Sequence, residues 1–306
     1  MDYFVPTDHL RHAPDASGRM RDSLFWQSII PEEKLGFQAY LYLTSKGQAG
    51  FNVLVWGEDR KPLVADVIQG EIAPDADLDD FAFNGFHLTQ TTMGAANRIA
   101  YASDKVQLEL EFTPRHAPFS YRANPSGLPG WFAVNRYEQS GWITGHITVG
   151  ERRIALDHMG HSDHSWGNRN WGVPQHWKWF VAYTPDGGKM INGWIWIARG
   201  EWGFGGYVVR DGVPEAIADI SHHAEYDEKM GQQRLEARIR DVSGAVTDLV
   251  LDRFGMIKIP TGDPFGTVIQ EAACTALIDG EAGAGQFETH WQASYIDHLA
   301  KTGSTR

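Results

Sequence analysis

The chain has 306 residues, of which 42% are hydrophobic and 22% are charged, a composition typical of folded soluble proteins. Its formal net charge of −12, without any local run of Lys or Arg, argues against nucleic acid and anionic membrane surfaces as partners. No apolar stretch approaches the roughly 18 residues that cross a bilayer, so stable membrane insertion is not expected. With one cysteine, Cys274, and no secretory leader pattern, we expect a cytoplasmic protein without disulfides or cysteine-based zinc sites.

Much of the chain alternates apolar and polar residues with the period of two that β-strands require. Residues 106–112 alternate strictly, and residues 177–183 are rich in aromatic and β-branched side chains. Turn signals such as Asp186-Gly187 separate these runs. The pattern predicts an all-β, up-and-down antiparallel fold with few short helices, preceded by an N-terminal arm over residues 1–19.

The two halves of the chain resemble each other. Residues 31–43 align with residues 185–197, and later strands continue to align at a nearly constant offset of about half the chain. Such an offset indicates a tandem duplication of one β module. We therefore expect two similar β domains, over residues 20–172 and 173–306.

The segment just before the second module is dense in residues that carry chemistry. Within it lie His158, His161, Asp163, His164, Trp166, Arg169 and Trp171. Ser162 is a suitable N-cap for a short helix beginning at Asp163. If residues 163–170 are helical, Asp163, Trp166 and Asn170 share a face, and Asp163 and Trp166 turn toward one cavity. The alternative is a structural lock between the modules, in which Asp163 pairs with Arg169.

Two metal-binding patterns occur in the same segment. His161-Ser-Asp163 has the His-x-Asp spacing of two-His-one-carboxylate iron sites, which would make the protein a non-haem iron oxygenase. His158, His161 and His164 could instead face one zinc ion. Both patterns are short in a chain with 13 His, so we expect no metal and no cofactor.

The run Asp163-His-Ser-Trp-Gly-Asn-Arg169-Asn-Trp171 resembles a signature of bacterial proteins related to hydroxyneurosporene synthase (carotenoid 1,2-hydratase) and of the AttH-like group. Trp26, the Tyr40-Leu-Tyr42 strand and the internal repeat are similar to the same family over nearly the whole chain. The resemblance implies two fused lipocalin-like (calycin-type) antiparallel β-barrels or strongly curved sheets. Fungal relatives of that architecture include hydratases and pericyclases.

These features together predict a cofactor-free hydratase, dehydratase, isomerase or cyclase that acts by acid–base chemistry on an apolar isoprenoid, terpenoid or polyketide-like molecule. The candidate proton donors are Asp163, His161 and His164, and which of them acts is left open. Arg169 completes the candidate catalytic set. The side chains expected to bind the substrate and to stabilise a carbocation are Tyr40, Trp166, Trp171, Trp177, Trp179, Trp194 and Trp196.

The residue types also predict how the candidate site is arranged. Burial among tryptophans would raise the pKa of Asp163, and Asp163 and His164 are expected to bracket one end of an apolar pocket. The alternative function is a non-catalytic carrier of lipids or terpenoids, because an eight-stranded barrel is about wide enough to hold one small ligand. The oligomeric state is left open.

Overall fold

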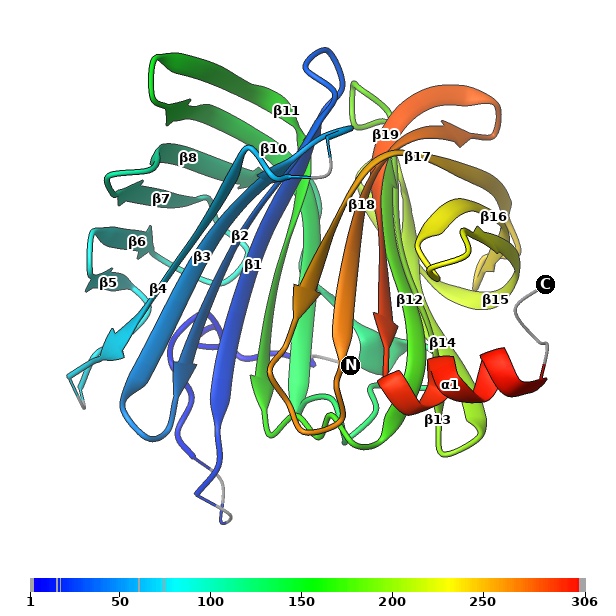
Figure 1. Cartoon of the computed structure of the whole chain (residues 1–306), viewed down its shortest axis with the longest axis horizontal. Coiled ribbons are helices and arrows are strands. Elements are labelled where there is room, and N and C mark those ends of the chain that lie inside the picture. The colour runs from blue at the N-terminus through cyan, green and yellow to red at the C-terminus, as the bar shows by residue number, and fades with distance from the viewer. Residues whose placement is uncertain (1–2, 15, 17, 60, 74, 303–306) are drawn as a thin grey trace.

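The computed structural model describes residues 3–14, 16, 18–59, 61–73 and 75–302, and the fold is all-β, as the alternation predicted (Figure 1). The first sheet contains β1 (Arg21–Ile30), β2 (Leu35–Thr44), β3 (Gln48–Trp56), β4 (Val64–Glu71), β5 (Asp80–Phe83), β6 (Phe86–Gln90), β7 (Asn97–Ala102), β8 (Gln107–Pro114), β9 (Phe119–Ser120), β10 (Asn135–Val149) and β11 (Arg152–Gly167). The second is a closed barrel of β12 (Pro174–Tyr183), β13 (Lys189–Ala198), β14 (Glu201–Arg210), β15 (Val213–Tyr226), β16 (Gln232–Asp241), β17 (Val246–Pro260), β18 (Val268–Ile278) and β19 (Glu281–Trp291). A 3₁₀ turn (Tyr121–Ala123) follows β9, and α1 (Ala293–Thr302) follows the barrel.

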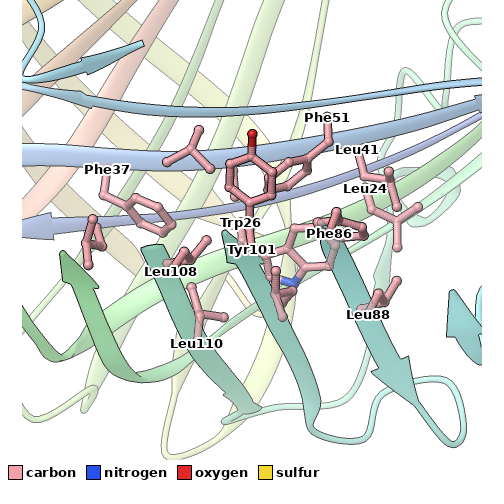
Figure 2. Packing of buried hydrophobic residues seen from close by; sticks show 14 of the residues in the cluster. Leu24, Trp26, Phe37, Leu41, Phe51, Phe86, Leu88, Tyr101, Leu108 and Leu110 are labelled. Atoms are coloured by element: carbon pink, nitrogen blue, oxygen red, sulfur yellow. The ribbon is translucent and has the colours of Figure 1, made fainter. Parts of the chain in front are cut away.

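The first sheet is a half-barrel, in which consecutive strands pair as antiparallel neighbours but the ring stays open between β4 and β5. β1 pairs with β11, which brings the two ends of this half of the chain together. The concave side holds a core of aliphatic and aromatic residues, among them Trp26, Phe37 and Phe51 (Figure 2). This side is therefore filled by the protein's own side chains.

The barrel closes through antiparallel pairing of β12 with β19. Its interior is packed with buried apolar residues, including Phe180, Phe287 and Cys274. A ligand in the lumen of this barrel, as the sequence suggested for a carrier, would have to displace that core. The barrel therefore serves here as a solid support.

The two halves begin with matching hairpins. Pro31 starts the turn between β1 and β2, and Pro185 starts the turn between β12 and β13. In each half the first strand also pairs with the last, so both halves share an up-and-down order. They differ because one ring closes and the other does not.

The convex faces of the half-barrel and the barrel pack against each other through a third, largely aromatic cluster that includes Phe25, Trp56 and Trp179. Figure 1 shows β1 and β2 beside β12, β18 and β19 in the middle of the molecule. Across the interface the backbone N–H of Ile29 donates a hydrogen bond to the Tyr183 hydroxyl oxygen at 3.1 Å. α1, the one α-helix found in the described residues, spans ten residues, too short to cross a bilayer.

The backbones of the two sheets approach each other at a pair of glycines. A Cβ built on Gly255 of β17 would lie 2.4 Å from the backbone oxygen of Gly57, which follows β3. A backbone atom cannot swing aside as a flexible side chain can. The contact therefore requires glycine at position 255.

We expect Gly255→Ala to lower the free energy of unfolding by about 1–3 kcal/mol, the usual cost of overpacking, because the methyl group forces the sheets apart. Denaturant unfolding measures this change. Gly130→Ala is the control, since a Cβ there would meet nothing within 4 Å. Equal stability of the two variants would show that the sheets do not depend on this contact.

Candidate active site between the two sheets

A cavity of about 370 Å³ lies between the convex faces of the half-barrel and the barrel, and we call it the inter-sheet cavity. Its wall combines aromatic rings with an unusual number of charged groups. The half-barrel contributes Arg21, Phe25, Tyr40, Tyr42, Phe132, Arg136, Asp163 and Ser165, the link between the sheets contributes Arg169 and Trp171, and the barrel contributes Trp177, Trp179, Trp194, Ile269, Glu271 and Glu288.

The segment that carries Asp163 is a strand, so the helix expected from Ser162 is wrong. Residues Arg152–Gly167 form β11, which pairs on one side with β1 and on the other with β10. Neighbouring residues of a strand point to opposite faces. Asp163 and Ser165 accordingly line the cavity, whereas His164 faces the concave side of the half-barrel.

The expectation that Asp163 and His164 bracket one pocket is therefore also wrong. His164 and Trp166 are absent from the cavity wall and pack around the N-terminal arm, where His12 stacks on Trp166 with ring centroids 3.9 Å apart. Asp22 Oδ1 lies 2.6 Å from Nδ1 of His12 and 3.2 Å from Nε2 of His164.

His12, Asp22 and His164 are also the one group of three potential metal ligands found among the described residues, with ligand atoms within 4.8 Å of one another. The expected sets, His161 with Asp163 and His158 with His161 and His164, do not form such a group there. In the structure the three residues hold one another by hydrogen bonds and fasten the arm to β1 and β11.

Asp163 is buried in the cavity wall, 8% exposed, and its carboxyl group is held by Arg136. The guanidinium Nη2 lies 3.0 Å from Oδ2 of Asp163 and 2.5 Å from Oε1 of Glu138. Burial raises the pKa of Asp163 to about 7; the charges of Glu138 and Glu288 add to the rise, and Arg136 opposes it. A carboxyl group with this pKa can both give and take a proton near neutral pH.

His161 stands behind the wall, fully buried and outside the cavity lining. Its Nε2 lies 3.1 Å from Glu138 and its Nδ1 lies 3.2 Å from the Ser140 hydroxyl. Burial lowers its pKa, although Glu138 opposes the shift. His161 can therefore position Glu138, which in turn holds Arg136, but it does not reach a ligand directly.

The structural-lock alternative required an ion pair between Asp163 and Arg169, and this pair does not form. The guanidinium of Arg169 lies over the rings of Phe132 and Trp171, 4.1 Å and 5.3 Å from their centroids, and donates to the Ser165 hydroxyl at 3.2 Å. Burial lowers its pKa to about 10, so it stays protonated at neutral pH.

Most of the predicted aromatic residues do line the cavity. Trp177 and Trp179 alternate along β12 on the face turned to the half-barrel, and Trp194 of β13 lies opposite Trp179. Tyr40 and Trp171 complete this set. Trp196, by contrast, is outside the lining and packs against Trp194, with ring centroids 4.4 Å apart.

Sequence reasoning missed a pair of glutamates. Glu271 and Glu288 lie directly opposite each other on β18 and β19, and both line the cavity. Burial raises the pKa of each carboxyl group, and repulsion by Glu288 raises that of Glu271 further. Trp177 Nε1 donates to Glu288 at 2.5 Å. The signal was present, since Glu271 alternates with the apolar residues Ile269 and Ala273 and so occupies an apolar face.

Solved structures show the same fold over nearly the whole chain. A Nitrosomonas europaea protein assigned as AttH is 14% identical with a TM-score of 0.70, and the match covers 95% of this chain and 96% of that one. Kievitone hydratase from Nectria haematococca is 12% identical with a TM-score of 0.58, covering 92% and 91%. CghA with Sch210972 is 12% identical with a TM-score of 0.59, covering 89% and 88%. These matches confirm the AttH-like resemblance and the fold.

No curated protein sequence matches the chain. A family match, in contrast, spans residues 5–293, which includes both sheets and every residue of the inter-sheet cavity. The chain therefore belongs to the DUF7064 family, which is described as a domain of unknown function.

Proposed function

We propose that the protein is a cofactor-free enzyme that transfers protons to and from carbon in an apolar small molecule. Its reaction class is hydration or dehydration of a C=C bond, isomerisation, or cyclisation. The observation that carries this proposal is the Asp163 carboxyl group, with a pKa of about 7, in the wall of an aromatic cavity of about 370 Å³.

In the forward direction of a hydration, protonated Asp163 gives its proton to one alkene carbon, and the other carbon becomes a carbocation. The faces of Trp177, Trp179 and Trp194 surround this space, and cation–π attraction stabilises such a cation by roughly 2 kcal/mol when water is excluded. Water then forms the C–O bond and loses a proton to a carboxylate. Loss of a neighbouring C–H proton instead gives an isomer. Attack by a second C=C bond gives a ring and a new carbocation, which then loses a proton to a carboxylate or takes up water.

Glu271 and Glu288 supply the second proton-accepting group. Burial raises the pKa of both carboxyl groups, which favours their protonated forms, and two carboxyl groups that face each other can accept one proton and release another. Glu288 also raises the pKa of Asp163, and both carboxyl groups line the same cavity. The arrangement thus offers an acid and a base to opposite ends of one double bond.

The comparisons support a small-molecule enzyme at the level of the fold. A hydratase shares the architecture, and so does CghA, whose structure contains Sch210972. The argument for proton transfer, however, rests on the residues of this chain. A carrier would use the same cavity without any need for the carboxyl groups.

The test is incubation in D₂O with a panel of isoprenoid alkenes, alcohols and acids, such as geraniol, linalool, farnesol and farnesoic acid, followed by mass spectrometry. We expect deuterium to enter carbon positions of at least one compound with wild-type protein and without added metal or cofactor. If compounds of the panel bind in the cavity and none of them takes up deuterium, the protein is a carrier.

A further inference from the structure

We propose that the ligand of the inter-sheet cavity carries an anionic group, such as a carboxylate or an acidic enol, and that Arg21 and Arg169 bind it. The inference rests on the proposed function only for the chemistry at Asp163. The binding of an anion follows from the charges of the wall alone.

Arg21 and Arg169 line the cavity without a carboxylate partner. Within the described residues, no Asp or Glu oxygen lies within 4.0 Å of either guanidinium, whereas Arg136 in the same wall has two such partners. Arg169 has only the Ser165 hydroxyl and two aromatic rings. A half-buried guanidinium with unused donors is costly unless a ligand completes its hydrogen bonds.

Arg21 is similarly underused. Its Nη2 donates to the Tyr40 hydroxyl at 2.7 Å, and its guanidinium lies 4.2 Å from the centroid of the Tyr42 ring. Its Nε is buried without any hydrogen-bond partner in the described structure. Arg21 is thus fixed in place by two tyrosines while part of its donor capacity stays free.

The two guanidiniums act on the same space. Burial would raise the pKa of Tyr40, but the positive charges of Arg21 and Arg169, together with the hydrogen bond to Ser23, lower it. The same proximity makes Arg21 one of the groups that lower the pKa of Arg169. Two like charges held close together in a wall are repelled by each other, and an anion between them relieves that repulsion.

The carboxyl groups of the cavity do not balance these charges. Asp163 and Glu138 share Arg136, and the pKa values of Glu271 and Glu288 are raised, which favours their neutral forms. The wall around Arg21 is therefore positive although the chain as a whole carries −12. A local charge opposite to that of the whole protein attracts anions specifically to this place.

Register gives the distance between the anion site and the proton donor. Asp163 lies opposite Phe25 on β1, and Arg21 is four residues before Phe25, which is roughly 13 Å along a strand. The aromatic wall lies on the barrel side of the same cavity. The inferred ligand thus has an acidic group at one end and its reacting double bond further along an apolar skeleton.

The test compares farnesoic acid with farnesol at pH 8, measuring binding by calorimetry and by quenching of tryptophan fluorescence. We expect the wild type to bind the acid at least tenfold more tightly. Arg21→Gln and Arg169→Gln should each remove most of this preference while changing the affinity for farnesol less than threefold. Arg169→Lys should keep part of the preference, because it keeps the charge.

Arg153→Gln is the matched control, because Arg153 lies exposed on β11 outside the cavity and its loss changes the net charge equally. Circular dichroism checks that each variant is folded. Equal affinities of the wild type for acid and alcohol, or a preference that survives both glutamine variants, would overturn the inference. Since no turnover is measured, anion preference without deuterium uptake would refute the proposed enzyme and leave the anion site standing.

Discussion

Replacing Asp163 with asparagine should lower turnover by at least two orders of magnitude, in line with the usual 10²–10⁴-fold contribution of a general acid. The amide has the shape of the carboxyl group but cannot supply its proton. Ligand affinity should change little, because the aromatic wall and the arginines remain. Deuterium uptake in D₂O and calorimetric binding measure the two effects separately.

The variant should also fold. A carboxyl group with a pKa raised to about 7 stabilises the folded state below its ordinary pKa near 4, and this contribution is lost as the pH rises through 7. Asparagine stays neutral throughout, so Asp163→Asn should be at least as stable as the wild type at pH 8. Asp157→Asn, an exposed change on the same strand, is the control. Full activity of Asp163→Asn would falsify the assignment of the acid.

The pH dependence of the reaction follows from the same group. Asp163 donates only while protonated, so turnover should fall about tenfold per pH unit above pH 7. Initial rates between pH 5 and pH 9 at saturating substrate check this slope. A rate that keeps rising above pH 8 would mean that a different group, with a higher pKa, is the donor.

Trp194→Ala should destabilise the protein by about 3–5 kcal/mol, the usual cost of removing a buried aromatic side chain. Trp194 is 1% exposed and packs against Phe132 of the half-barrel and Trp196 of its own strand, at centroid distances of 4.8 Å and 4.4 Å. Its loss therefore weakens the barrel surface and the interface together. Guanidinium unfolding followed by circular dichroism measures the change.

Trp202→Ala is the matched control, because Trp202 lies on the neighbouring strand β14 and is 63% exposed. We expect that change to cost less than about 0.5 kcal/mol, as surface substitutions usually do. A similar loss of unfolding free energy in both variants would mean that burial of Trp194 in the interface adds little to the stability of the protein.

The sequence was sufficient for the strands and turns because their signals are local. Alternation predicted β8, and the aromatic and β-branched residues of 177–183 predicted β12. The internal repeat predicted matching turns at Pro31 and Pro185, which the structure has. The prediction of a helix at Asp163 was wrong because the conformation of that segment is not decided by local signals. Ser162 and a spacing of three and four residues favour a helix, but pairing of β11 with strands on both sides decides the conformation. Tertiary pairing outweighs local propensity here.

The site was only partly predictable. Asp163 and the tryptophans could be named because they cluster in sequence. Arg136 reaches Asp163 only through the β10–β11 register, in which Glu138 lies opposite Asp163, and one sequence alone does not reveal that register. Arg21 is likewise brought to the cavity by the pairing of β1 with β11.

β11 separates two compartments with a single layer of backbone. Its odd-numbered residues Asp163 and Ser165 belong to the cavity, and its even-numbered residues His164 and Trp166 belong to the other side. Inserting or deleting one residue before Asp163 would exchange the two sets, which would leave imidazole and indole facing the ligand and a carboxyl group inside the half-barrel. Substitutions in this strand therefore keep the two compartments distinct, whereas the number of residues between the preceding turn and Asp163 has to stay constant.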